Sequence, residues 1–137
     1  MRYAAIDVGS NSCRLLVADV NQGQLQPVCR ELQSTRLGEG VTATKKINPV
    51  AMKRTRDCLK DYVDETRRLR VKDFRMVAAS AMRDALNREE FLELVKESCG
   101  CNLEVISGEE EAQLSYLGVK EGLALISPLV VDLGGGS

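Results

Sequence analysis

The sequence contains no histidine, and this absence excludes several kinds of catalytic and metal site within the 137 residues. A Ser-His or Cys-His nucleophile pair needs an imidazole as its base, and many zinc sites use the same side chain as a ligand. The acids and bases available near neutral pH are therefore carboxylates and thiols.

The sequence also lacks long apolar runs and an excess of either charge. No segment approaches the roughly 20 unbroken apolar residues of a membrane span, and we expect no secretory signal before Arg2. The net charge of −1 gives no general electrostatic reason for binding nucleic acid or an anionic membrane. We therefore expect a cytoplasmic protein that has neither DNA nor a membrane as its partner.

The five cysteines do not form the pattern of a disulfide framework, because their number is odd and their spacing irregular. Cys99-Gly100-Cys101 is open to two interpretations, a metal or redox pair and a reduced thiol pair at the end of a helix. No second pair is present to complete four metal ligands, so the sequence favours the reduced pair.

Chain length and residue order predict one core of α/β class, with a mixed sheet covered by helices. Asn21-Gln22-Gly23 indicates a hairpin, so the opening strands should be antiparallel neighbours. N-terminal caps are expected at Asn48, at Asn87 with Glu90, and at Ser107 with Glu110. The expected strands cover 2–9, 13–20, 24–35, 74–79, 103–106 and a segment after Pro128, the expected helices 48–69, 87–99 and 107–122, and a polar loop 37–46.

Two short glycine-rich turns, each opened by an aspartate, are the most informative motifs. The first reads Asp-Val-Gly-Ser-Asn-Ser over residues 7–12, and the second reads Asp-Leu-Gly-Gly-Gly-Ser over residues 132–137. Glycine lets the backbone approach an anion closely, and the unpaired N–H groups of such a turn point at it. Because a carboxylate repels a bare phosphate, each aspartate favours an intervening cation such as Mg²⁺. The pair predicts two facing halves around one phosphoryl site.

The sequence ends at Ser137, within the second of these two glycine-rich turns. We therefore expect residues 1–124 to form an amino-terminal domain and residues 125–137 to be the first strand and phosphate loop of a truncated second domain. The apolar stretch 125–131 would then expose unpaired backbone groups, which favours pairing with another copy as a homodimer. The alternative is a tail that folds back on its own domain or is disordered.

Three consecutive glutamates, Glu109 to Glu111, stand at the start of the last predicted helix. Carboxylates near a helix N-terminus gain about 0.3 to 1 kcal/mol each from the helix dipole and caps, which accounts for Glu110 as the partner of Ser107. Three in a row exceed what capping needs. Glu111 lies one residue beyond the capping pair, so it is either a further helix-start charge or a general base for an attacking water.

Arg83 follows a stretch of small apolar residues, 77–81, at the carboxyl end of a predicted strand. Ligand crevices in open α/β sheets lie outside those ends, and an arginine there suits a bidentate contact with phosphate. The alternative is an ordinary surface charge, which is the commoner role for the 19 lysines and arginines of the chain.

Five ordered motifs together resemble the amino-terminal domain of the exopolyphosphatase/guanosine pentaphosphate phosphohydrolase (Ppx/GppA) family. They cover residues 5–12, 36–40, 78–85, 106–112 and 132–137. The resemblance implies the actin/Hsp70/sugar-kinase fold, built of two ribonuclease-H-like halves with the active site between them. Threonine is usual in the family where this chain has Ala79, so a hydroxyl contact near Arg83 is not expected from that position.

The resemblance also implies roles for individual residues. Glu111 would activate water, and Asp7 and Asp132 would hold Mg²⁺. The residues implied in phosphate binding are Gly9, Ser10, Asn11, Arg83, Gly134, Gly135, Gly136 and Ser137.

The resemblance implies hydrolysis of a terminal phosphoanhydride in polyphosphate or guanosine pentaphosphate, with little turnover from residues 1–137 alone. Two other hypotheses remain open. One is an ATPase or sugar kinase of the same fold, which explains Glu111 poorly. The other is a non-catalytic module that binds guanosine tetraphosphate or a phosphorylated partner.

Overall fold

The computed structural model describes the backbone of residues 1–123 and the side chains of residues 1–118. Within them lies one five-stranded sheet in the order β3-β2-β1-β4-β5. The strands are β1 (Arg2–Val8), β2 (Ser12–Asn21), β3 (Gln24–Ser34), β4 (Asp73–Ala78) and β5 (Glu104–Val105). β1, β2 and β3 are antiparallel neighbours, whereas β4 runs parallel to β1 and β5 parallel to β4. The predicted mixed sheet with antiparallel opening strands is confirmed.

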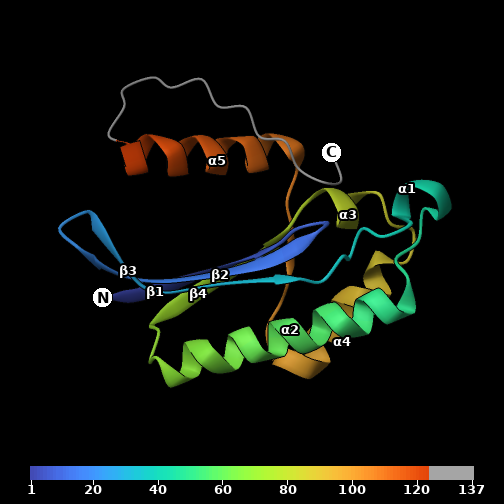
Figure 1. Cartoon of the computed structure of the whole chain (residues 1–137), viewed down its shortest axis with the longest axis horizontal. Coiled ribbons are helices and arrows are strands. Elements are labelled where there is room, and N and C mark those ends of the chain that lie inside the picture. Colours follow the sequence, from blue (N-terminus) through green and yellow to red (C-terminus); the bar gives the residue numbers. More distant parts are fainter. Residues whose placement is uncertain (124–137) are drawn as a thin grey trace.

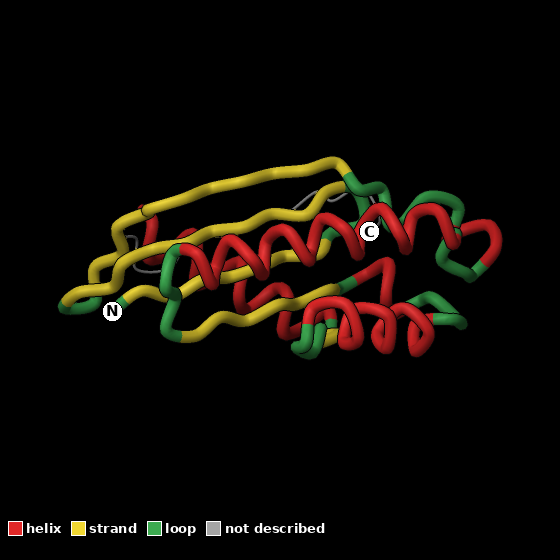
Figure 2. Tube along the Cα trace, turned by 90° about the horizontal axis from the view of Figure 1, so that it is seen from below, coloured by secondary structure: helices red, strands yellow, loops and turns green. Residues whose placement is uncertain are grey.

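Helices cover both faces of this sheet. They are α1 (Val41–Thr44), α2 (Pro49–Arg68), α3 (Ser80–Arg83), α4 (Arg88–Cys99) and α5 (Gly108–Leu123). Helices α2 and α4 lie side by side under one face, and α5 runs over the other (Figure 1). The view from below shows α2 lying along the strands with α4 beside it (Figure 2). No helix of residues 1–123 is long and apolar enough to cross a membrane.

The core lies on the face that α2 and α4 cover, which we call the closed face. Alternation along the strands places every second residue there, so Ile6 and Val8 are buried while Asp7 between them is not. The helices bury their apolar stripes against these strand residues. The largest fully buried side chains are Phe91, Ile6, Leu15, Leu37, Ile47, Leu59 and Met82.

Two of the three predicted caps are confirmed. The Asn48 side chain accepts a hydrogen bond from the Val50 N–H at 2.8 Å, and the Ser107 hydroxyl accepts one from the Glu110 N–H at 3.1 Å. Asn87 is the N-cap residue of α4, as predicted, but its side chain makes no capping hydrogen bond. Its amide instead binds the N–H and C=O of Ile47 at 2.8 and 3.0 Å, tying the start of α4 to the segment before α2.

The predicted loop 37–46 is wrong in part, because one turn of it is the helix α1. Gly40 precedes that turn with a φ of 77°, a conformation that favours glycine. Residues 124–137, with the last predicted strand, the second phosphate loop, the second domain and the dimerisation segment, lie outside the described residues.

Candidate active site

The first phosphate loop joins β1 to β2 and is closed by its own backbone. The Gly9 N–H donates to the Ser12 carbonyl at 3.0 Å, and a Cβ on Gly9 would lie 2.8 Å from that oxygen. Only glycine fits without a shift of the loop. Among the described residues, the N–H groups of Ser10 and Asn11 make no hydrogen bond, so both donors are available to an anion.

The segment 36–38 braces this loop from the side. The Arg36 N–H donates to the Asn11 carbonyl at 3.0 Å, and the Gly38 N–H donates to the Ser10 carbonyl at 2.8 Å. A Cβ on Gly38 would lie 2.9 Å from the Ser10 Cβ. The motif at 36–40 therefore orients the loop through its backbone, a role that its sequence did not reveal apart from the presence of glycine.

Ser80 connects the loop to the neighbouring strand. Its hydroxyl lies 2.9 Å from that of Ser10, at the point where β4 ends beside β1. Sequence reasoning discussed a hydroxyl at position 79, where this chain has alanine, and did not assign the Ser80 hydroxyl to the site. The available signal was its place just beyond the carboxyl end of a parallel strand, where ligand crevices form.

Arg83 and Glu111, the predicted phosphate contact and the predicted base, form an ion pair. The Arg83 Nη1 donates to the Glu111 Oε2 at 3.3 Å and to the Ile106 carbonyl at 3.1 Å. Glu111 lies in the first turn of α5, as the capping pattern predicted. Because Nη1 makes both contacts, the other guanidinium nitrogens have no hydrogen-bond partner within the described residues and remain available to an anion.

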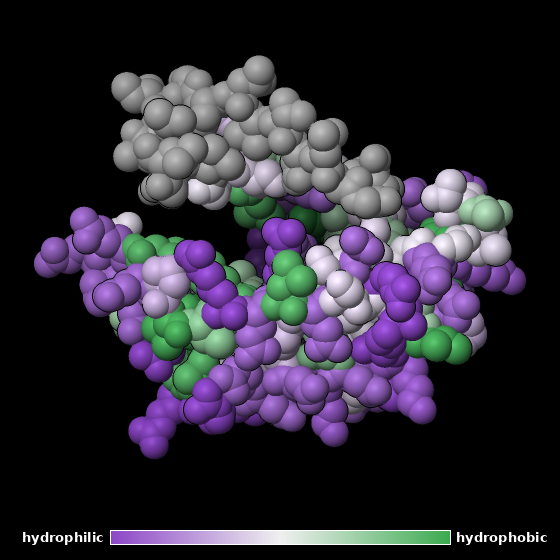
Figure 3. All heavy atoms as spheres, viewed as in Figure 1, coloured by the Kyte–Doolittle hydropathy of each residue, from purple (hydrophilic) through white to green (hydrophobic). Residues whose placement is uncertain are grey.

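Glu111 and Asp7 line one cleft of about 350 Å³ on the sheet face opposite the core, which we call the open face. The space-filling view shows a hollow above the sheet on this side of the molecule (Figure 3). The remaining lining residues are Ala5, Ile6, Arg75, Val77, Ala79, Ile106, Leu114 and Ser115. Tertiary structure thus brings a carboxylate from β1 and one from α5 to the same side of the sheet, beside the loop that precedes β2.

The donor chemistry of the cleft suits a hard cation. Asp7 presents a carboxylate, and Ser10 and Ser80 add hydroxyl oxygens at the adjoining loop. Oxygen ligands of this kind are those that Mg²⁺ prefers. The second predicted ligand, Asp132, and the second loop, Gly134 to Ser137, lie outside the described residues.

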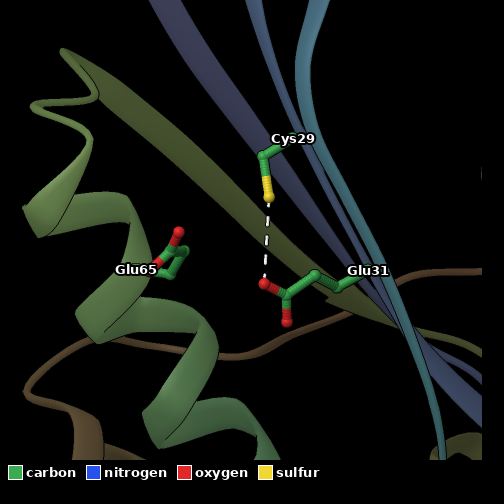
Figure 4. Close-up of side chains that lie close together, drawn as sticks. All are labelled: Cys29, Glu31 and Glu65. Carbon is green, nitrogen blue, oxygen red and sulfur yellow. Dashed lines mark hydrogen bonds between the residues drawn. The ribbon is translucent and has the colours of Figure 1, made fainter.

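A separate cluster of ligand atoms lies on the closed-face side of the exposed strand β3. The thiol of Cys29 and the carboxylates of Glu31 and Glu65 lie within 4.8 Å of one another, and the Cys29 thiol donates to Glu31 at 3.8 Å (Figure 4). Both Glu65 oxygens are already bound by the Arg68 guanidinium. This occupied carboxylate makes the cluster a surface ion-pair group rather than a metal centre.

All five cysteines are free thiols. Cys99 ends α4, and Gly100 follows it with a φ of 72° as the C-cap. Burial raises the pKa of the Cys99 thiol to about 11, so the thiol keeps its proton at neutral pH and is a poor metal ligand. The geometry agrees with the interpretation of Cys99 and Cys101 as a reduced pair.

The sequence and the fold both match known proteins. The profile of the Ppx/GppA phosphatase family matches residues 16–137. Exopolyphosphatase 2 of Mycobacterium tuberculosis is 46% identical over 147 residues, a match that covers 99% of this chain and 46% of the relative. The chain thus spans about half the length of the curated relatives it matches.

Solved structures of the same family superpose closely on the fold described above. A Ppx/GppA family member from Aquifex aeolicus has a TM-score of 0.86 at 37% identity and covers 91% of this chain and 41% of its own. An exopolyphosphatase from Cytophaga hutchinsonii has a TM-score of 0.79 at 28% identity, covering 83% of this chain and 36% of its own. The actin-like α/β fold implied by the resemblance is confirmed, and the chain belongs to the Ppx/GppA phosphatase family.

Proposed function

We propose that the whole protein removes the terminal phosphate of inorganic polyphosphate by hydrolysis. The names of its Mycobacterium and Cytophaga relatives support the substrate. One structural observation carries the proposal. The Glu111 and Asp7 carboxylates line one cleft, and the glycine loop that follows Asp7 in the chain has two N–H groups that make no hydrogen bond within residues 1–123.

Glu111 would orient a water molecule and accept its proton. The water oxygen would attack the terminal phosphorus in line, and the bridging oxygen would leave with the bonding electron pair, giving orthophosphate and a chain shorter by one unit. Hydrolysis of this type depends mainly on positioning and on stabilisation of charge. The first turn of α5 fixes the carboxylate, and the Arg83 contact orients it.

The loop amides and Arg83 would bind the phosphate oxygens. The N–H groups of Ser10 and Asn11 are donors, and Arg83 offers the nitrogens that Glu111 leaves unbonded. Asp7, with Asp132, would hold Mg²⁺, which when bound supplies positive charge to the transferring phosphate. Because this chain covers only 46% of the length of the Mycobacterium relative, we expect residues 1–137 alone to turn over little substrate.

The experiment compares Glu111→Gln with Glu109→Gln in the whole protein. Glu109 lies in the same turn, is exposed, and makes no ion pair within the described residues. We expect Glu111→Gln to reduce phosphate release from polyphosphate by about 10² to 10⁴-fold with substrate binding retained, and Glu109→Gln to leave it unchanged. Hydrolysis by Glu111→Gln at the normal rate would show that Glu111 is not the base, whereas binding of polyphosphate by the whole protein without any hydrolysis would favour a binding module.

Parallel assays with guanosine pentaphosphate and with ATP plus sugars separate the remaining alternatives. We expect the highest kcat/KM for polyphosphate. A higher value for guanosine pentaphosphate would keep the reaction and change the substrate. Phosphate transfer to a sugar would replace the hydrolase with a kinase of the same fold.

A further inference from the structure

We propose that Arg75 is a positioning residue for Glu111, because it ties the first turn of α5 to the sheet through Glu110. The inference rests on the proposed role of Glu111 as the base. It concerns a different residue on a different strand, which neither the resemblance nor the motifs singled out.

Arg75 bridges three elements with one guanidinium. It projects from β4 on the open face and lines the same cleft as Glu111. Its Nη2 donates to the Glu110 Oε1 at 2.7 Å and to the Glu104 Oε2 at 2.9 Å, and its Nε donates to the Glu104 Oε1 at 3.1 Å. The two hydrogen bonds to Glu104 fix the Arg75 side chain on the sheet, and the hydrogen bond to Glu110 connects it to α5.

Apolar packing contributes little to holding the described part of α5. Leu114 and Leu117 leave 39% and 51% of their surface exposed. The Ser107 cap stabilises the helix itself but does not attach it to the strands. Attachment of the first turn of α5 therefore depends on two arginines. Arg83 binds the Ile106 carbonyl and the Glu111 carboxylate. Arg75 binds the Glu110 carboxylate.

Arg75 and Arg83 bind the adjacent residues Glu110 and Glu111, so loss of the Arg75 contact should also affect the position of the proposed base. Glu110 and Glu111 share a helical turn, so a shift or rotation that frees Glu110 moves the Glu111 carboxylate as well. Misplacement of a reacting group by about 1 Å can cost about 10²-fold in rate. A small displacement of α5 should therefore affect the chemical step before it affects folding.

Arg75, Glu104 and Glu110 form an ion-pair group that we call the clamp. The Arg75 guanidinium holds the pKa of Glu104 below its ordinary value, and the two carboxylates raise the pKa of Arg75. All three side chains are more than 40% exposed, so each pair contributes little to global stability. Loss of the clamp should leave the domain folded, which makes a positioning role testable.

The first test uses the 137-residue chain and compares Glu110→Ala with its neighbour Glu109→Ala. Amide hydrogen exchange is measured at Glu111, whose N–H donates to the Ser107 carbonyl at 2.9 Å. We expect roughly 3 to 10-fold faster exchange in Glu110→Ala and in Arg75→Ala, as for a locally loosened turn, with Glu109→Ala unchanged. Equal exchange in Glu110→Ala and Glu109→Ala would overturn the clamp.

The second test measures kinetics in the whole protein. For Arg75→Ala and Glu110→Ala we expect kcat to fall by about 3 to 10-fold with KM nearly constant, and Arg75→Lys to recover part of the loss by keeping the charge. The variant that combines Arg75→Ala with Glu110→Ala should be no slower than Arg75→Ala alone, because the two substitutions remove the same Arg75–Glu110 interaction. The positioning role would be overturned if the kcat losses of the two single variants added in the combined variant. It would also be overturned if Arg75→Ala or Glu110→Ala showed faster amide exchange at Glu111 without any loss of kcat.

Failure of this inference is distinguishable from failure of the proposed function. If Glu111→Gln is inactive while Glu110→Ala keeps full kcat, the base assignment stands and the positioning role is wrong. If Glu111→Gln is fully active, Glu111 is not the base and the positioning role falls with it, whereas the exchange data still decide whether Arg75 holds α5. If the unaltered whole protein releases no phosphate from polyphosphate, the proposed function itself is wrong.

Discussion

The two faces of the sheet divide stability and chemistry between them. On the closed face, α2 and α4 cover the strands, and residues such as Ile6, Leu15 and Phe91 are fully buried. On the open face, α5 stands above a cleft lined by Asp7, Arg75 and Glu111. The closed face therefore holds the core, while the proposed chemistry would take place on the face where side chains remain accessible.

This division follows from the two-residue period of a β-strand. Ile6 and Asp7 are neighbours in β1, and Arg75 and Met76 are neighbours in β4, yet each pair points to opposite faces. A substitution can therefore damage one face and spare the other. The predictions below use that separation, from the largest expected effect to the smallest.

Removal of a large closed-face side chain should cost far more stability than removal of one from the open face. Phe91 in α4 is fully buried, so Phe91→Ala should lower the free energy of unfolding by about 3 to 5 kcal/mol. Leu114→Ala on α5 should change it by less than about 0.5 kcal/mol, because Leu114 is 39% exposed. Urea denaturation of both variants checks the contrast, and equal losses would show that α5 is packed as tightly as α4.

A single hydrogen bond on the closed face should have a smaller effect on unfolding. The Tyr62 hydroxyl donates to the Cys13 carbonyl at 3.1 Å in the core. Burial raises the pKa of Tyr62, so the donor keeps its proton throughout the neutral range. Tyr62→Phe should lower the free energy of unfolding by about 0.5 to 1.5 kcal/mol, measured by the same denaturation. A neutral result would mean that Cys13 finds another donor.

Acid should loosen the open face before it unfolds the closed one. The pKa of Glu104 is held below its ordinary value of 4.5 by Arg75, so the stabilisation is fully present above pH 4.5 and is lost as the pH falls through the lowered pKa. We expect the protection factors of amides at the start of α5, which are corrected for the intrinsic exchange rate at each pH, to fall below about pH 4 while α4 stays protected. Glu104→Gln should show the lower protection already at pH 7, and a pH dependence of protection that persists in Glu104→Gln would assign the effect to another carboxylate.

Local patterns in the sequence were sufficient to predict most of the fold. Apolar runs and the hairpin turn at residues 21–23 located the opening strands, and Asn48 and Ser107 marked the starts of α2 and α5, because each signal depends only on neighbouring residues. Asn87 likewise marked the start of α4, but the role of its side chain was predicted wrongly. Its cap pattern is present in the sequence, but in the folded chain Ile47, forty residues away, offers the side chain two backbone partners.

The sequence by itself determined the residue types of the site, namely the glycine loop after Asp7, the arginine at 83 and the carboxylate at 111. Only the tertiary structure decided which of them meet. The Arg83–Glu111 pair, the Ser10–Ser80 contact and the Arg75–Glu110 clamp each join elements distant in sequence. The register of β4 beside β1 and the path of α5 over the open face bring these atoms together, and no local pattern encodes a distance across packed elements.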